Sequence, residues 1–148
     1  MKLEILTKLD DIKARPYRAH ATDAGADLYS NSDITIYPEE QKLINTGVAV
    51  KIPQGYVGLV YNRSSQGKIR IVIPNSVGVI DSDYRGNIMV LLYNDGKDPY
   101  FIKCYDTRIA QLVIAPVILA EFKPWIGLSE LWEETERGSG GFGSTNNK

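Results

Sequence analysis

Five segments of this 148-residue chain carry side chains able to bind or transform an anionic substrate. The segment GVIDSDYRGN (78–87) places two carboxylates, Asp81 and Asp83, in a turn between apolar runs. Asp and Gly are common in turns because they tolerate unusual backbone angles, so a plain hairpin turn is the first interpretation. Asp81 also directly follows the apolar run that ends at Ile80, and partial desolvation would tune such a carboxylate for proton transfer.

Two segments contain groups that suit a phosphate or a hydrated cation. NRSSQGK (62–68) sets an arginine and two hydroxyls where a strand is expected to end, and such donors bind phosphate through charge-assisted hydrogen bonds. Ser64 or Ser65 could equally open a single helical turn as its N-cap. DAGADLYS (23–30) carries Asp27 after a small-residue turn, where it could hold magnesium directly or through water.

The last two segments lie in the C-terminal third of the chain. In TRIAQLV (107–113), Arg108 and Gln111 interrupt an apolar strand, which indicates either a site or a subunit interface. In RGSGGFGSTNNK (137–148) the glycines would let backbone amides curl around an anion, although glycine-rich ends are also commonly flexible. This tail adds donors and a flat aromatic ring through Arg137, Phe142, Ser144 and Thr145.

Short apolar runs rich in β-branched and aromatic residues must position these segments. Gly, Pro, Asn and Asp separate the runs at strand-plus-turn spacing, which predicts an all-β fold of sandwich or barrel type. The clearest helix candidate is SELWEETE (129–136), and it is short. We therefore expect one β domain over 1–136 and a flexible glycine-rich arm over 137–148. The main runs are 43–52, 55–62, 69–73, 87–94 and 108–118.

Composition excludes several classes of function. The 17 basic and 18 acidic side chains are balanced, so neither a nucleic-acid polymer nor a membrane surface is an expected partner. The single cysteine, Cys104, and the single histidine, His20, cannot supply the usual zinc ligands, so any metal should be oxygen-bound magnesium. The segment MKLEILTKLD has no signal-peptide core, which predicts a cytoplasmic protein.

Taken in order on an all-β chain of this length, the five segments resemble the trimeric dUTPase family, the dUTP nucleotidohydrolases. The resemblance extends from Asp23 to Thr145, and its most specific pieces are GVIDSDYRG and RGSGGFGST. It implies a jelly-roll-like β-barrel with at most a very short helix, assembled as a homotrimer with shared active sites. The implied activity is Mg²⁺-dependent hydrolysis of dUTP to dUMP and pyrophosphate, in the cytoplasm, or the host cytoplasm for a viral protein. That reaction limits uracil in DNA and supplies dUMP for dTMP synthesis.

The resemblance also assigns roles to individual residues. Asp81 matches the general base that activates water to attack the α-phosphate, and Asp27 matches a residue that contacts magnesium mainly through water. A hairpin from Pro74 to Tyr84 would read uracil and leave no space for a 5-methyl group. The implied substrate-binding residues are Arg63, Ser64 and Ser65 at the phosphates; Asn75, Gly78, Val79 and Ile80 at uracil; Tyr84 at the deoxyribose; Gln111 at the magnesium triphosphate; and Arg137, Phe142, Gly143, Ser144 and Thr145 in the arm.

Several positions depart from the family pattern. Asn62 stands where the family commonly has proline, and the segment after the Arg-Ser-Ser motif is about one residue short. The residues 104–107 replace the usual Gly-Asp, and the tail ends Ser-Thr-Asn instead of Ser-Thr-Gly. Two other functions stay open: a dCTP deaminase of the same fold, and a nucleotide-sensing regulator that binds a protein partner.

Overall fold

The structure is a computed structural model that describes residues 3–126 and 133–141. The chain divides into two units, Met1–Ile118 and Leu119–Lys148, and the elements found in the described residues belong to the first. No helix in these described ranges is long and apolar enough to cross a membrane. The elements are β1 (Leu6–Leu9), η1 (Ile12–Ala14), β2 (Ala26–Tyr29), β3 (Ile34–Ile36), β4 (Gln41–Asn45), β5 (Val48–Lys51), β6 (Tyr56–Tyr61), α1 (Ser64–Lys68), β7 (Ile71–Val72), β8 (Gly78–Ile80), β9 (Met89–Asn94), β10 (Tyr100–Ile102) and β11 (Arg108–Pro116).

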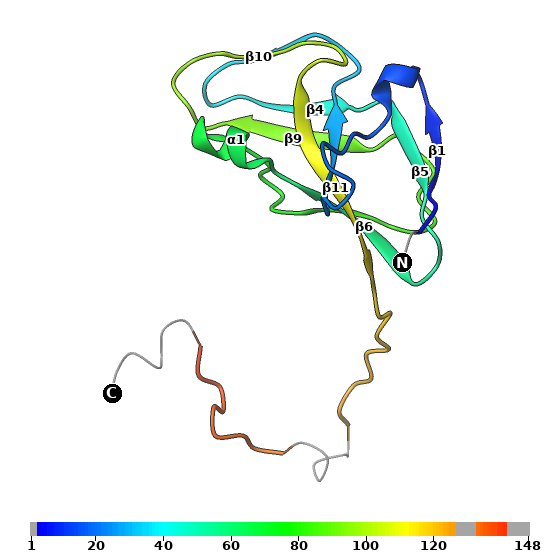
Figure 1. The fold of residues 1–148 in the computed structure, drawn as a ribbon. Coiled ribbons are helices and arrows are strands. Elements are labelled where there is room, and N and C mark those ends of the chain that lie inside the picture. Colours follow the sequence, from blue (N-terminus) through cyan, green and yellow to red (C-terminus); the bar gives the residue numbers. More distant parts are fainter. Residues whose placement is uncertain (1–2, 127–132, 142–148) are drawn as a thin grey trace. The chain divides into compact units, whose positions relative to one another are not determined.

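Antiparallel strands of the first unit form four sheets (Figure 1). The largest has the strand order β2-β11-β6-β8, and a second has the order β4-β9-β7. The pairs β1-β5 and β10-β3 complete the set. Neighbours in these sheets are mostly distant in sequence, as expected of a jelly-roll-like all-β fold.

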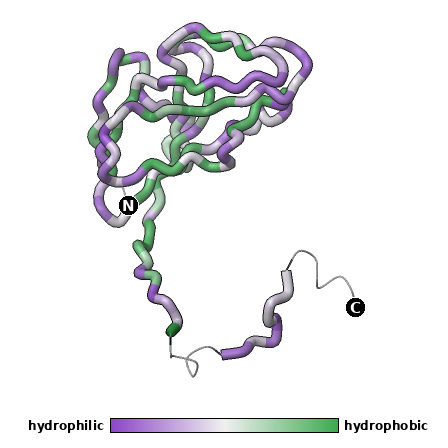
Figure 2. The backbone as a smooth tube through the Cα atoms, turned by 180° about the vertical axis from the view of Figure 1, so that it is seen from behind, coloured by the Kyte–Doolittle hydropathy of each residue, from purple (hydrophilic) through white to green (hydrophobic). Residues whose placement is uncertain are grey.

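The core lies between the sheets. Alternate residues of the strands point inward, so Leu28 of β2, Ile44 of β4 and Leu92 of β9 are all fully buried. Figure 2 colours the backbone by hydropathy, and hydrophobic and hydrophilic segments follow one another along the first unit. Burial of each such side chain contributes about 1.5–3 kcal/mol to the stability of the fold. A shift of one residue would turn these side chains toward solvent, so their burial fixes the strand register and thereby the positions of the polar side chains on the same strands.

Four of the five apolar runs form strands much as expected, and one is divided. The run 43–52 contains parts of two strands, β4 and β5, because a turn separates them at Thr46 and Gly47. Gly47 has a φ of 70°, and a Cβ there would lie 3.1 Å from the hydroxyl of Tyr105. Glycine alone satisfies both conditions at low cost, so the backbone reverses at this position.

The two turns expected around the candidate base are not hairpins. β7 pairs with β9, whereas β8 pairs with β6, so the segment from Pro74 to Tyr84 crosses between two sheets. The turn after β8 likewise joins the four-stranded sheet to β9 in the three-stranded sheet. Both hairpin interpretations are therefore wrong, because sequence neighbours here find their strand partners elsewhere in the chain.

The helix candidate 129–136 lies partly outside the described residues, and its described part, 133–136, is not helical. The short helix that does form is α1, directly after the arginine of the Arg-Ser-Ser motif. In the second unit, consecutive turns include a hydrogen bond from the Gly138 amide to the Thr135 carbonyl, and Gly138 has a φ of 52°.

Candidate active site

Three residues far apart in sequence, Asp27, Gln111 and Tyr61, lie in one row across the four-stranded sheet. Asp27 on β2 is directly opposite Gln111 on β11, and Gln111 is directly opposite Tyr61 at the end of β6. Directly opposed residues of antiparallel strands project from the same face of a sheet. Arg63 follows the end of β6, so strand pairing brings the Arg-Ser-Ser motif to the same place.

Asp27 binds two arginines. Its Oδ1 accepts a hydrogen bond from Arg63 Nε at 2.7 Å, and its Oδ2 accepts from Arg63 Nη2 at 3.3 Å and from Arg108 Nη1 at 3.1 Å. The Asp27 and Arg63 side chains are only 17% and 21% exposed, so water weakens this pairing less than at an open surface. Together the three side chains carry one net positive charge, which favours an anionic ligand.

The helical turn α1 begins at the arginine of the motif. Arg63 is its N-cap, and no side chain caps it, so the expectation that Ser64 or Ser65 would serve as the cap is wrong. Both serines are exposed in the first turn of the helix. Ser65 Oγ accepts a hydrogen bond from Arg63 Nη1 at 3.3 Å, so this hydroxyl lies beside the guanidinium group. Because it only accepts in that bond, its own proton can still be donated to an anion.

Asn62, which departs from the family's proline, orders this segment through hydrogen bonds. Its Nδ2 donates to the Ile71 carbonyl at 2.8 Å, and its Oδ1 accepts from the Arg63 amide at 3.0 Å. Its carbonyl accepts from Gln111 Nε2 at 2.9 Å. The asparagine thus restrains the approach to Arg63 by side-chain contacts where a proline would restrain φ.

A cavity of about 310 Å³ adjoins this cluster, lined by Asp27 and Gln111 and by loop residues that include Tyr17 and Asp23. Tyr17 and Asp27 exchange two backbone hydrogen bonds, of 3.0 and 2.7 Å, which hold the loop against β2. A Cβ at Gly25 would collide with Gln111 Oε1, so glycine permits the close packing there. Tyr17 was not among the predicted site residues, since nothing in its local sequence marks the contact with Asp27. Arg108 was expected to belong to a site or a subunit interface, but its contact with Asp27 was not predicted.

The acidic residues near this cavity fit magnesium only with help from a ligand. No group of three or more His, Cys, Asp or Glu side chains in the described ranges could hold a metal ion. Asp27 already accepts three hydrogen bonds, which occupy most of the roughly four acceptor sites of a carboxylate. Because Mg²⁺ keeps several waters and takes substrate phosphate oxygens, a water-mediated contact from Asp27 suits it.

Asp81 lies at the opposite end of the same sheet. Ile80, the last residue of β8, is paired with Gly58, and β8 runs antiparallel to β6 away from the row that contains Tyr61. Along the strand direction, the rise per residue puts Asp81 about 13 Å from that row. Perpendicular to the strands, two strand spacings put Asp81 about 10 Å from Gln111. No side chain spans such a separation, so one copy of the chain does not bring Asp81 to the arginine cluster.

The Asp81 carboxylate is exposed, so the expectation of partial desolvation is wrong for the single chain. Ile80 is buried, but the chain turns outward at the next residue, and the Asp81 carbonyl accepts from the Tyr84 amide at 3.2 Å. Asn75 is exposed in the preceding turn, where Ser76 has a φ of 70°. Gly78 of the expected uracil segment is paired with Val60, next to the row that contains Tyr61, whereas Ile80 and Asp81 lie farther from that row.

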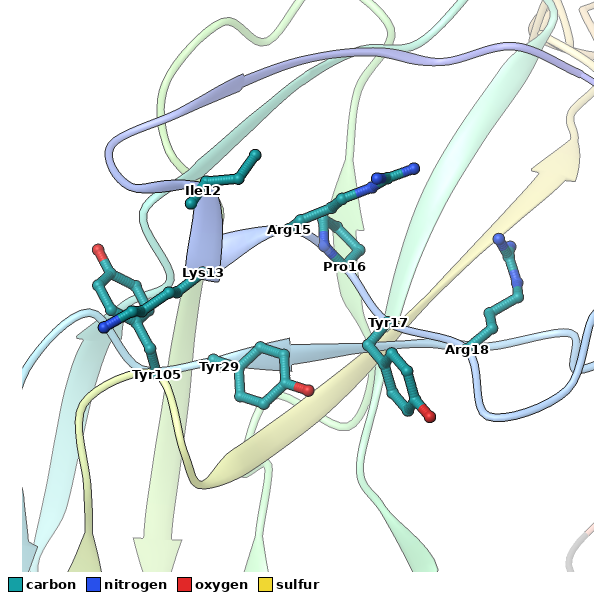
Figure 3. A pocket seen from close by; sticks show the side chains of 8 residues that line it. All are labelled: Ile12, Lys13, Arg15, Pro16, Tyr17, Arg18, Tyr29 and Tyr105. Atoms are coloured by element: carbon teal, nitrogen blue, oxygen red, sulfur yellow. The ribbon is translucent and has the colours of Figure 1, made fainter.

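A larger cavity, of about 620 Å³, contains none of the predicted site residues (Figure 3). Three tyrosines and three cationic side chains line it, but Lys13 extends toward Tyr105 whereas Arg15 and Arg18 extend the other way. Burial raises the pKa of the Tyr105 hydroxyl, with smaller contributions from Cys104 and from two nearby aspartates. Because its cations diverge, this cavity does not provide a focused anion site.

The arm residues are only partly described. Arg137 Nε donates to the Gly140 carbonyl at 3.1 Å, and the Gly140 amide donates to the Arg137 carbonyl at 3.1 Å. The glycine-rich stretch therefore makes a compact local turn around the arginine. The other predicted arm residues, Phe142, Gly143, Ser144 and Thr145, lie outside the described residues.

Comparison with solved structures supports the fold. The dUTPase of Staphylococcus bacteriophage 80alpha, solved with dUPNHPP, superimposes with a TM-score of 0.84 at 34% identity and covers 97% of this chain and 98% of that chain. The dUTPase of phage phi11 of S. aureus, described with a structural Mg(II) ion, gives a TM-score of 0.75 at 32% identity, over 82% of this chain and 96% of that chain.

Sequence relatives agree with these structures. The deoxyuridine 5'-triphosphate nucleotidohydrolase of Nautilia profundicola is 47% identical over 98% of this chain and 99% of its own length. That of Cutibacterium acnes is 45% identical over 90% of this chain and 86% of its own length. The dUTPase family model matches residues 12–146, which include the Arg-Ser-Ser motif and the Asp81 turn. The chain therefore belongs to the dUTPase family.

Proposed function

We propose that this chain hydrolyses dUTP to dUMP and pyrophosphate, and so limits uracil in DNA and supplies dUMP for dTMP synthesis. The family match over residues 12–146 carries this proposal. The Asp81 carboxylate takes a proton from a water molecule, whose oxygen forms a bond to the α-phosphorus. The bond from that phosphorus to the α,β-bridging oxygen breaks, and pyrophosphate leaves with the bonding electrons.

The arginine cluster provides the phosphate site in this proposal. Arg63, Ser64 and Ser65 donate to the triphosphate, while Asp27 holds the Arg63 guanidinium in place through two hydrogen bonds. Gln111 is held by the Asn62 carbonyl at 2.9 Å and faces the same cavity as Asp27. Most of the acceleration of phosphoryl transfer comes from such positioning and charge neutralisation.

We propose Mg²⁺ as the cofactor, held by substrate oxygens and by water-mediated contact with Asp27. When bound with the triphosphate, it supplies neutralisation of negative charge. The Asp27 carboxylate would hold the ion through water, because its acceptor sites are already bonded to Arg63 and Arg108. A structural Mg(II) ion is described in the D95N mutant of the phage phi11 relative, so one member of the family binds magnesium.

Base and sugar selection are assigned to the segment that ends at Tyr84. Backbone groups of Gly78, Val79 and Ile80, together with Asn75, would read the uracil edge, and the Tyr84 ring would pack on the deoxyribose. Gly78 permits close packing of β8 on β6, because a Cβ there would lie 3.1 Å from Cβ of the buried Val60. The exposed Tyr84, 40% accessible, has a free ring face for the sugar.

The sheet topology supports the proposal of an active site shared between chains. The proposed general base and the proposed phosphate residues lie at opposite ends of the sheet β2-β11-β6-β8, and a site built from two copies of the chain would bring them together. A homotrimer with three such shared sites is the assembly that we propose, in the cytoplasm and without nucleic-acid polymer or membrane partners. Closed cyclic symmetry gives each site the same composition.

The proposed arm, residues 137–148, closes over a site with Arg137, Ser144 and Thr145 at the γ-phosphate and with Phe142 over uracil, while 1–136 form the barrel domain. Ordering the arm costs roughly 1–2 kcal/mol per residue, so bound nucleotide must provide compensating contacts.

Ending the chain before Arg137 should lower kcat/KM for dUTP by roughly 100-fold, through lost positioning, and leave the trimer intact. Steady-state kinetics and size-exclusion chromatography measure the two effects, and near-normal turnover would refute the lid.

Pyrophosphate release from dUTP, dTTP, dCTP and UTP with magnesium tests the proposed reaction. We expect rapid release from dUTP alone, since uracil and deoxyribose are both selected. Ammonia release from dCTP would instead indicate a deaminase of the same fold.

A second candidate role is nucleotide-dependent binding to a protein partner. The solved 80alpha phage dUTPases are described as controlling transfer of virulence genes by a proto-oncogenic G protein-like mechanism. Pull-down with and without dUTP would reveal such a partner, and partner binding that persists in a variant without turnover would separate the two roles.

A further inference from the structure

The aromatic ring of Tyr84 is fixed against the backbone of the two residues that follow the Asp81 turn. Its hydroxyl donates to the Asn87 carbonyl at 2.9 Å. A Cβ at Gly86 would lie 2.5 Å from the Tyr84 hydroxyl oxygen and 2.8 Å from Cζ. The ring therefore rests on the bare backbone of Gly86, with no gap behind it, and only its other face is available to a ligand.

Asn87 ties this backbone to two other parts of the chain. Its Nδ2 donates to Asp10 Oδ2 at 2.8 Å and to Asn45 Oδ1 at 3.1 Å, so both amide hydrogens are used. Asn45 Oδ1 also accepts from the Gly47 amide at 2.8 Å, and the Gly47 carbonyl accepts from the Asp10 amide at 2.9 Å. The residue after β1, the turn after β4 and the entry to β9 are thus linked through one side chain.

We infer that Asn87, held by Asp10 and Asn45, is a positioning residue that fixes Tyr84 and thereby sets the discrimination between deoxyribose and ribose. This inference rests on the proposed function, in which the Tyr84 ring packs on the sugar. A ring excludes a 2'-hydroxyl only if it cannot retreat, since selectivity against a larger ligand depends on a clash that is not relieved. The ring can retreat only as far as the backbone of 86–87 allows, and Asn87 restrains that backbone.

Replacing Asn87 with alanine tests the inference through substrate selectivity. The ratio of kcat/KM for dUTP to kcat/KM for UTP should fall by roughly tenfold, the scale of one positioning hydrogen-bond set. A merely structural role would lower both values in the same proportion and leave the ratio unchanged. Gly86→Ala displaces the exposed ring directly and should lower the same ratio, which shows that the assay detects movement of Tyr84.

The contacts of Asn87 provide matched controls. Asp10→Asn keeps an oxygen that accepts from Asn87 and should retain the wild-type ratio, whereas Asp10→Ala should lower it. Asp11→Ala removes the neighbouring carboxylate, which bonds the Lys13 amide at 2.8 Å and not Asn87, and should leave the ratio unchanged. The double variant with Asp10→Ala and Asn87→Ala should lose little more selectivity than Asn87→Ala alone, because Asn87→Ala already removes the contact with Asp10.

A second readout separates this inference from the proposed reaction. Fluorotyrosine placed at position 84 should give a shifted or broadened ¹⁹F resonance in Asn87→Ala and not in Asp11→Ala, whatever the substrate. Unchanged spectra and an unchanged dUTP-to-UTP ratio would overturn the inference, even with an active wild-type enzyme. Absence of dUTP hydrolysis by the wild type would refute the proposed function, while the spectra would still decide the role of Asn87.

Discussion

Asp81→Asn should lower kcat for dUTP by roughly 10²–10⁴-fold, the range expected when a general base is removed. Asparagine has the shape of aspartate but cannot take a proton from the attacking water. The carboxylate is exposed and makes no hydrogen bond that the described structure records, so folding should be unaffected. Single-turnover kinetics and the dissociation constant for dUTP, which should change little, measure the effect on chemistry and on binding separately.

Asp83→Asn is the matched control for this experiment. Asp83 is an exposed carboxylate two residues away in the same connection, and it should keep near-normal turnover when neutralised. Equal losses in both variants would show that negative charge in this turn matters, not proton transfer by Asp81. Near-normal turnover of Asp81→Asn would reject Asp81 as the base.

Two inactive variants, Asp81→Asn and Arg63→Ala, should regain activity when they assemble together. The two residues lie at opposite ends of one sheet, so we expect a working site to take its base from one chain and its phosphate-binding arginine from another. In each mixed trimer about one third of the sites receives both intact residues under closed symmetry, because only one of its three interfaces pairs the two chains in the required order. Co-expression with two affinity tags, followed by kinetics on doubly purified assemblies, measures the recovery.

Mixing Asp81→Asn with Asp81→Ala is the control, because no assembly of these chains contains an intact base. It should remain inactive at the level of each variant alone. Thermal melts of Arg63→Ala establish that the variant is folded, since the change leaves Asp27 with Arg108 as its remaining arginine partner. Mixed assemblies of Asp81→Asn and Arg63→Ala that stay inactive while folded would place the whole site within one chain.

The local chemistry of the site could be predicted from the sequence. The β-branched runs separated by turn residues predict strands because period-two burial and backbone preference act over a few residues. The Arg-Ser-Ser motif and the Asp81 turn are also contiguous, so their side chains are close together in any fold. Family resemblance then connected these segments to one reaction, and the match over residues 12–146 confirms the family.

The pairing of strands in the sheets decided which of the candidate site residues are neighbours in space. Asp27, Gln111 and Tyr61 form a row only because β2, β11 and β6 are neighbours, and such long-range register depends on burial of the whole core. The same pairing separates Asp81 from Arg63, although only 18 positions divide them in sequence, and it replaces the expected hairpins with crossings between sheets. The local backbone preferences of a segment carry no information about which distant strand it pairs with, so they predict neither the row of Asp27, Gln111 and Tyr61 nor the separation of Asp81 from Arg63.

The sequence by itself therefore determined the fold class and the family, and its motifs predicted the chemical groups of the site. Tertiary structure decided that Asp27 is bonded to both Arg63 and Arg108, that Asn62 supports the phosphate loop, and that Asn87 holds the backbone beneath Tyr84. The Asp27 contacts, and those of the Asn87 side chain with Asp10 and Asn45, join elements far apart in the chain. The Asn62–Arg63 and Tyr84–Asn87 bonds are local. Their geometry arises from packing of the sheets around one core, which no single segment specifies.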